Sequence, residues 1–433
     1  MKKIIVFLLL LVCTAGFLAA ETMELTLEEA VKLGLANSTG IRTKMLAVAS
    51  AEADLAAARS AYTPDISASV SYGRLNEGNP VTGQDPVALD LDVIQSITTF
   101  GKTSAGVRLA EEGLSQARLD LEEEQRSLTV MIENAFYTYL LALELDAINR
   151  ETLTNKEDAL GVARQRYKAG LISDFEVLTA ESDLESFKST VISSANGIEV
   201  ALLNVRNMLN IPPDAEFDVV LIGELAPVPV ELDKEALIER ALAARYDVRS
   251  FRTLLKLAEA QESLNRSLRL PTLGALFNYS VDSGVDISSG ESRYGVEDWE
   301  KSWSVGVSLS IPVSGWFPWS GESLEVKKSA LSLERQRLEF SSLESGLRIA
   351  VETLLLKIAE EEAKIASGAK SVELAERLYA SAAQQYEAGL ISSIDLKDAQ
   401  LGLGGARLAY TQAVYGYNMN VLKLKDTVGV VEF

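Results

Sequence analysis

The chain contains the same short stretch twice, with a single difference between the copies. Tyr167–Ser173 reads YKAGLIS, and Tyr386–Ser392, which lies 219 positions later, reads YEAGLIS. Each copy lies between long segments whose apolar residues recur at intervals of three and four, the spacing typical of helices. Glycine ends a helix at little cost because it adopts the left-handed backbone conformation without a steric clash. The sequence therefore predicts two helical hairpins that reverse at these stretches.

The helices on either side of the reversals are predicted to be very long. No proline occurs between Pro86 and Pro212, and none occurs after Pro318. A helix from Lys102 to Arg166 would be roughly 100 Å long at the usual rise per residue. No compact globular domain needs such a helix, so we expect extended hairpins with coiled-coil packing.

Before each long helical segment, two short segments alternate apolar with polar residues, which is typical of strands with one apolar face. The polar positions are mainly serine, together with Asp65, Asp90 and Asp92. These carboxylates would favour cations along the polar face. The apolar positions are Ile66, Ala68, Val70, Tyr72, Leu89, Leu91 and Val93, and then Leu273, Ala275, Phe277, Tyr279, Val281, Trp303, Val305, Val307, Leu309 and Ile311.

The order of these elements indicates an internal duplication and a mostly α, α+β fold. Thr26 with Glu29 forms a capping-box pattern that opens one helix running to about Ser60, and Asp233 opens the equivalent helix. Between the repeats we expect a linker with at most one edge strand. The predicted parts are a first repeat over 21–213, with a β-hairpin at 65–98 and a helical hairpin at 101–209; a linker or equatorial segment at 214–232; and a second repeat over 233–433, with a β-hairpin at 272–313 and a helical hairpin at 320–425.

Residues 1–20 have the composition of a secretory signal peptide. Two lysines precede a long apolar run, and small residues follow it before Glu21. The single cysteine, Cys13, lies inside this segment. Whether Cys13 carries a lipid stays open, although Val12 before it is larger than the residue that such sites prefer.

The composition argues against catalysis and against several classes of partner. The chain has no histidine, and 62 acidic against 41 basic residues give a net charge of −21. Histidine-based catalysis and most transition-metal sites are therefore excluded, and nucleic acid or anionic headgroups are unfavourable partners. Ser96–Thr103 resembles a phosphate-binding loop but lacks its first glycine, and the matching joint Trp316–Gly321 has no lysine. We expect a protein that is not an enzyme and needs no cofactor or metal.

Four two-faced strands leave a structural problem, because their edges are open and they are too few to close a barrel alone. If three copies pooled their strands, twelve strands could close without an edge. A closed barrel with apolar residues outside and Ser or Asp inside is what a lipid bilayer demands of strands, and secretion makes an outer membrane reachable.

At this level the chain resembles the TolC-type outer-membrane efflux channel family. The resemblance rests on Leu25–Ala30, on the helix-to-strand joints at Pro64 and Pro271, and on the paired stretches Ala169–Leu171 and Ala388–Leu390. It implies a homotrimer with one shared barrel in outer-membrane lipid and helices that extend into the periplasm. The channel would be a passive exit duct of a tripartite efflux or type I secretion system, served by a periplasmic adaptor protein and an inner-membrane transporter, with unspecified cargo.

The resemblance also implies site residues at the reversals. Asp395 and Asp398, in the pattern Asp, two residues, Asp, Ala, would form a periplasmic gate, to which the first copy contributes Glu176 in place of Asp395 and Thr179 in place of Asp398. The alternative is that these acidic residues simply favour the first turn of a helix through the helix dipole. The adaptor would dock on the tips, at Ala169, Gly170, Leu171, Ile172, Ala388, Gly389, Leu390 and Ile391.

Three further interpretations stay open at this point. A periplasmic coiled-coil structural or adaptor protein would also use helical hairpins, although it would not need two-faced strands. The four tryptophans around the second β-hairpin fit either an interfacial aromatic girdle or ordinary loop packing. A glycine cluster in the last helix predicts close helix contact near the tip. The tryptophans are Trp299, Trp303, Trp316 and Trp319, and the glycines are Gly402, Gly404 and Gly405.

Overall fold

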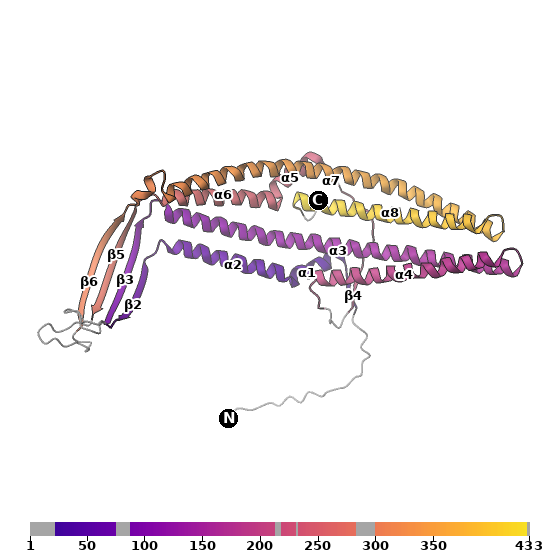
Figure 1. The fold of residues 1–433 in the computed structure, drawn as a ribbon, viewed down its shortest axis with the longest axis horizontal. Coiled ribbons are helices and arrows are strands. Elements are labelled where there is room, and N and C mark those ends of the chain that lie inside the picture. The colour runs from indigo at the N-terminus through magenta and orange to yellow at the C-terminus, as the bar shows by residue number, and fades with distance from the viewer. Residues whose placement is uncertain (1–21, 75–86, 213–217, 231–232, 283–298, 431–433) are drawn as a thin grey trace, which may run out of the picture. The chain divides into compact units, whose positions relative to one another are not determined.

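The computed structural model describes residues 22–74, 87–212, 218–230, 233–282 and 299–430. The predicted signal peptide, including Cys13, lies outside these ranges, as do the connections within the two β-hairpins (Figure 1). The elements, in order, are β1 (Thr22–Leu25), α1 (Leu27–Asn37), α2 (Thr39–Ser60), β2 (Asp65–Tyr72), β3 (Val87–Thr98), α3 (Lys102–Lys168), α4 (Asp174–Met208), β4 (Asp218–Leu221), α5 (Lys234–Ala244), α6 (Tyr246–Ser267), β5 (Thr272–Asp282), β6 (Glu300–Ser310), the 3₁₀ turn η2 (Val313–Trp316), α7 (Gly321–Glu387) and α8 (Ser393–Val428).

The predicted long helices are present. The helices α3 and α7 have 67 residues each, and the return helices α4 and α8 have 35 and 36. This confirms the mostly α fold with long helical hairpins. In the part of the chain that the structure describes, no helix is both long enough and apolar enough to cross a membrane.

The chain divides into two compact units that do not follow the two repeats. The hairpin unit comprises residues 1–39, 127–231 and 354–424 and contains both reversals, while the sheet unit comprises 40–126, 232–353 and 425–433. Each unit draws on both repeats, because α3 and α7 each contribute to both. The boundaries of the two sequence repeats therefore do not coincide with the boundaries of the two compact units.

The four predicted strands form one antiparallel sheet in the order β2–β3–β5–β6 (Figure 1). Its register places apolar residues opposite one another across all four strands: Val70 pairs with Leu89, Leu89 with Val281, and Phe277 with Val305. Because side chains alternate between the faces, serines and aspartates share the other face. The apolar face is largely exposed in the single chain, and β2 and β6 are the edge strands.

Before each β-hairpin the sequence predicts one helix. This prediction is wrong, because each of these segments forms two helices. The first breaks at Ser38, where ψ is 123°, and the second at Arg245, where ψ is 133°. At the first break, the Asn210 Nδ2 donates to the Asn37 carbonyl at 3.0 Å. At the second, Gly429 packs so closely that a Cβ there would lie 2.7 Å from the Arg245 Cα. Distant residues stabilise both breaks, so the local helical pattern does not reveal them.

The predicted linker contains a paired strand. The strand β4 pairs in parallel with β1, Leu25 opposite Leu221, and both leucines are buried. The segment after it is held by Asn418 of α8, which is buried: its Oδ1 accepts from the Val228 N–H at 3.1 Å, and its Nδ2 donates to the Ala226 carbonyl at 2.9 Å. Four-residue strands are too short to show a periodicity, so the sequence does not predict this parallel pair.

The joint between β6 and α7 explains two of the four tryptophans. The Trp316 Nε1 donates to the Arg269 carbonyl at 3.0 Å, and the Trp319 ring stacks on Phe317 with centroids 5.0 Å apart. These two rings pack locally, although both remain exposed. Trp303 instead lies on the apolar face of the sheet, opposite Tyr279.

Candidate functional site: the two helix reversals

Both reversals have the same hydrogen-bonded geometry, known as the Schellman motif. Gly170 and Gly389 have φ values of +72° and +77°. The Leu171 N–H donates to the Arg166 carbonyl at 2.9 Å, and the Leu390 N–H donates to the Gln385 carbonyl at 2.8 Å. These bonds satisfy carbonyls that the helix end would otherwise leave without a partner. The repeated glycine is therefore required by the backbone of each reversal.

The apolar tip residues separate into two groups. Leu171 and Leu390 are exposed, as predicted for a docking surface. Ile172 instead packs against buried residues of the first hairpin, and Ile391 packs against buried residues of the second. These two predicted docking residues are therefore only partly exposed, because the residue after the leucine already turns back into its own hairpin.

Two exposed apolar residues near the tips were not singled out from the sequence. Phe175 lies in the first turn of α4, and Ile394 occupies the equivalent place in α8, 219 positions later. Both are highly exposed. An apolar residue at the same position of both duplicated first turns was the available signal, but neighbouring acidic residues obscured it.

The predicted gate residue Asp395 also caps helix α8. Its Oδ2 accepts from the Ser392 N–H at 3.0 Å and from the Ser392 hydroxyl at 2.7 Å, while the Asp395 N–H donates to the Ser392 Oγ at 3.2 Å. These hydrogen bonds from Ser392 lower the pKa of the Asp395 carboxyl. This pattern is a reciprocal capping box with aspartate in the third position. The first copy differs, because Ser173 makes no side-chain cap.

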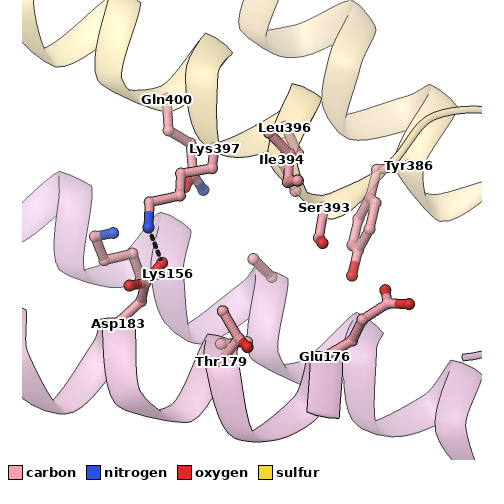
Figure 2. Close-up of a pocket in the computed structure, with 12 residues that line it drawn as sticks. Lys156, Glu176, Thr179, Asp183, Tyr386, Ser393, Ile394, Leu396, Lys397 and Gln400 are labelled. Carbon is pink, nitrogen blue, oxygen red and sulfur yellow. Dashed lines mark ion pairs between the residues drawn. The ribbon is translucent and has the colours of Figure 1, made fainter. Parts of the chain in front are cut away.

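Glu176 lies in a cleft of the hairpin unit, where its carboxylate points toward the Tyr386 hydroxyl (Figure 2). Burial raises the pKa of Tyr386, and the charge of Glu176 acts in the same direction. Deeper along the cleft, the Lys397 Nζ lies 2.7 Å from the Asp183 Oδ2, which links α8 to α4 (Figure 2). Burial lowers the pKa of the neighbouring Lys156.

The three predicted gate carboxylates do not form one cluster in a single chain. Asp395 and Asp398 are both exposed on the first turns of α8, whereas Leu396 and Ala399 between and after them are buried. Glu176 lies in the cleft instead. Within the described ranges, no group of three or more acidic residues is placed to hold a metal ion.

Arg166 is a further residue of this site that sequence reasoning missed. It lies in the last turn of α3, and its Nη1 donates to the Tyr386 carbonyl at 3.1 Å. Its guanidinium also lies 4.9 Å from the centre of the Tyr386 ring. The first reversal is thereby attached to the second. Gln385 occupies the equivalent position in the second repeat, so this attachment runs one way only.

The glycine cluster in α8 does not allow close helix contact, contrary to prediction. A Cβ built at Gly402, Gly404 or Gly405 meets nothing within 4 Å. Close approach occurs instead at Gly416, where a Cβ would lie 3.3 Å from the Glu361 carboxylate, and at Gly368, where it would lie 3.5 Å from Tyr410. Spacing in the sequence could not distinguish an open glycine face from a packed one.

Long helical hairpins combined with a two-faced, open-edged sheet define a channel protein of the outer-membrane type. The family model described as outer membrane efflux protein matches residues 30–210 and 237–430. The chain belongs to this family, which confirms the predicted family and its outer-membrane location.

Relatives of known name agree with this assignment. The chain is 24% identical over 324 residues to protein CyaE of Bordetella pertussis, covering 73% of this chain and 66% of CyaE. It is 26% identical over 191 residues to the outer membrane efflux protein BepC of Brucella suis, covering 44% of this chain and 42% of BepC. It is 21% identical over 385 residues to the outer membrane protein TolC of Escherichia coli, covering 86% and 76%. The matched stretches thus span less than two thirds of the first two relatives.

Solved structures share the fold. The CusC channel superposes with a TM-score of 0.78 at 15% identity, covering 93% of this chain and 92% of that one. VceC of Vibrio cholerae superposes equally well at 16% identity, covering 93% and 96%. The open state of MtrE from Neisseria gonorrhoeae gives a TM-score of 0.72 at 18% identity, covering 93% and 89%.

The reversal geometry predicts a specific cost for adding a methyl group. Gly389→Ala should lower hairpin stability by about 1–2 kcal/mol, because alanine disfavours the left-handed conformation. Gly161→Ala is the matched control: Gly161 lies in α3 with open space around it, so alanine should leave stability unchanged or raise it by up to about 1 kcal/mol. Thermal unfolding of the detergent-solubilised proteins by circular dichroism measures both. Equal midpoints would contradict the left-handed geometry at Gly389.

Proposed function

We propose that three copies of this chain pool their sheets into one closed barrel in the outer membrane and their helices into a periplasmic duct. The duct is a passive exit path, and cargo enters it from an inner-membrane transporter through a periplasmic adaptor protein. The observation that carries this proposal is the four-stranded sheet, whose apolar face is in register across every strand and whose two edges are unpaired within the described residues.

The unpaired edges favour closure with further copies. The strands β2 and β6 each have one side without a hydrogen-bonded neighbour in the described chain. An open edge is unstable in lipid, because each backbone N–H and C=O that lacks a partner there costs several kcal/mol. Joining β6 of one copy to β2 of the next removes both edges, and three copies supply twelve strands. The large exposed residues of the apolar face, such as Val70, Trp303 and Val305, then contact lipid.

The polar face then lines the pore. The Asp92 Oδ1 accepts from the Asn278 Nδ2 at 2.8 Å, so this carboxylate is held on that face. Asp90 lies two residues earlier and pairs across the sheet with Ser280. Three copies of these carboxylates around one pore would favour cations over anions. A reversal potential measured across planar bilayers in a salt gradient tests this preference, and an anion-selective potential would contradict it.

If the copies share one barrel, the protein should form an oligomer in the membrane that boiling dissociates. The protein should fractionate with the outer membrane and run as a trimer on a gel without boiling, and as a monomer after boiling, because the strands of different copies are held only by non-covalent contacts. The alternative, a periplasmic coiled-coil protein, would be released by osmotic shock. Release of most of the protein by shock would overturn the proposed function.

The tips of the hairpins are the proposed adaptor-docking surface. Ala169, Gly170, Ala388 and Gly389 keep the tips small, and Leu171 and Leu390 are the apolar side chains exposed there. The exposed Phe175 and Ile394 extend this surface. Ile172 and Ile391 support it from inside the hairpins instead of contacting the adaptor.

Charged residues at the tips should abolish export without disrupting the trimer. Leu390→Asp together with Leu171→Asp places two charges on the apolar docking surface, and we expect loss of resistance to exported compounds while trimers remain in the outer membrane. Ser371→Asp introduces one aspartate at an exposed position of α7 away from the tip, and it should leave export and trimer formation unchanged. Normal export by the double variant would refute the docking surface.

We propose that Asp395 and Asp398 form the gate and that Glu176, the equivalent of Asp395 in the first copy, contributes a further carboxylate. In a trimer, three copies of the two exposed aspartates would surround one axis at the start of α8. Like charges so arranged repel one another unless cations or hydrogen-bond donors lie between them. Cations or donors bound between the carboxylates would then hold the entrance closed. Removing the carboxylates would remove these bridges and loosen the entrance.

The gate proposal can be separated from helix capping by conductance in planar bilayers. Asp395→Ala and Asp398→Ala should give larger or longer openings than the parent. Ser392→Ala removes the cap partner of Asp395 but keeps the charge, so its conductance should match the parent; Asp174→Ala removes an acidic residue from the first turn of α4 and should match it too. If both aspartate variants keep the parent conductance, these residues are ordinary surface.

A further inference from the structure

We propose that a groove between α8 and the first helical hairpin binds an anionic amphiphile, a long-chain carboxylate such as laurate. The alkyl chain lies along the apolar walls of the groove, and the carboxylate pairs with Lys156 at the end nearer the reversals. The site uses none of the residues proposed for the gate or the docking surface. It does not depend on how many copies assemble.

The groove is apolar and has the size of a small-molecule site. Its volume is about 590 Å³, within the range of roughly 300–1,000 Å³ that such sites occupy. All of its walls belong to the hairpin unit and come from α3, α4 and α8. Their large apolar side chains are Leu145, Ile148, Phe187, Leu401 and Leu408. On α3 the lining runs from Ala142 to Lys156, which is roughly 21 Å of helix and enough for an extended laurate chain.

Glycines keep the groove open. Gly404 and Gly405 line it on α8, and a Cβ built at either position meets nothing within 4 Å. The same is true of Gly197 on the α4 wall. Larger side chains at positions 404 and 405 would therefore occupy the space that the alkyl chain needs.

Polar contacts hold α8 against α3 on both sides of these glycines. The Gln400 Nε2 donates to the Asn155 carbonyl at 3.2 Å. The Arg407 guanidinium pairs with Glu151 of α3, and its Nη2 lies 2.7 Å from the Glu376 Oε1 of α7. The groove between these contacts is thus already formed in the single chain, so a ligand binds without the cost of rearranging the helices.

Lys156 is the only charged residue among the described residues that line the groove. Asp183 acts on it electrostatically, but Asp183 is itself paired with Lys397 at 2.7 Å, and no ion pair to Lys156 forms within the described ranges (Figure 2). The Lys156 Nζ lies 5.4 Å from the centre of the Phe187 ring, a contact that compensates the charge only in part. Burial lowers the pKa of Lys156, because the ammonium loses hydration there. A carboxylate beside it would supply the missing counter-charge.

Two hydroxyl groups on the walls already have partners. The Ser194 Oγ donates to the Asp146 Oδ1 at 2.7 Å, and the Thr152 Oγ1 donates to the Ile148 carbonyl at 2.8 Å. These donors are not available to a polar ligand, whereas an alkyl chain requires none. Apolar walls with one cation at the end therefore favour a ligand with an apolar body and a single negative head over a sugar or a peptide.

The charge of the whole chain does not oppose this site. A net charge of −21 disfavours an anionic membrane surface, which carries many charges over a large area. A single carboxylate on Lys156 responds chiefly to charges within about 10 Å, the screening length at 0.1 M salt. The charges that act on Lys156 are those of Asp183 and Lys397, which offset each other, so the positive charge of Lys156 remains.

Photo-cross-linking tests the site in the full-length protein, reconstituted in lipid nanodiscs. Laurate with a diazirine on its chain is irradiated with the protein, and the labelled peptides are identified by mass spectrometry. The parent should carry label on α8 around Gly404 and on the facing walls of α3 and α4. Lys156→Met should lower this labelling at least tenfold, because the carboxylate loses its counter-charge. Dodecanol with the same photoreactive group, which has no charge, should label these segments of the parent at least tenfold less than laurate.

Matched variants separate the charge and the space from general damage to the fold. Lys156→Arg keeps the charge and should keep the labelling. Lys188→Met removes an exposed lysine of α4 that is paired with Glu185 outside the groove, and it should match the parent. Gly404→Leu with Gly405→Leu should abolish the labelling by filling the groove. Far-UV circular dichroism shows whether each variant keeps its helices.

The outcomes decide the site independently of the proposed channel. Label that Lys156→Met does not lower, or equal labelling by dodecanol, would overturn the carboxylate as the ligand. A parent without label on these segments, because another copy or a partner protein covers the groove, would overturn the site as a whole. Neither result bears on the proposed channel, which is tested by the heat-dependent oligomer and by conductance.

Discussion

An edge strand carries backbone N–H and C=O groups that must find partners before the strand can enter lipid. The four-stranded sheet of this chain has two such edges, and its apolar face is most exposed on the two edge strands, β2 and β6. The long helix α7 also has an uncovered apolar face, since Leu338 is exposed there whereas the equivalent Leu119 of α3 is buried. Edge, sheet face and helix face are all open in the single chain, and the proposed closure with further copies would cover each of them.

Duplication gave the chain two similar hairpins, and a few substitutions made them different. The Schellman geometry is the same at Gly170 and Gly389. The residues around it differ: Asp395 caps its own helix through Ser392, whereas Glu176 turns into the cleft toward Tyr386. Arg166 reaches from the first reversal to the carbonyl of Tyr386, and the second repeat has Gln385 in its place. The second hairpin is thereby held by the first, and its two aspartates, Asp395 and Asp398, are exposed in the single chain.

Much of this architecture was predictable because its signals are local and repeated. Alternation over Ile66–Tyr72 or Trp303–Leu309 allows few structures other than a two-faced strand. The repeated AGLIS stretch marked both reversals within a residue. The helix breaks at Ser38 and Arg245 and the parallel pair of β1 with β4 were not predictable, because each depends on residues more than 150 positions away. The capping role of Asp395 was hidden for a different reason: glutamate is the usual third residue of a capping box, and aspartate there reads as a free charge.

The sequence by itself determined the periodicity of every long element, the glycine at each reversal and the two polarities of the sheet. These follow from backbone sterics and from the solubility of side chains, which act over a few residues. Only the tertiary structure decided which apolar residues are covered. Leu333 and Leu338 have the same chemistry and lie on the same helix, yet one is buried and the other exposed. Ile391 and Leu390 are neighbours, yet only the leucine projects from the tip. Burial depends on what packs opposite, and that is a property of the assembled chain.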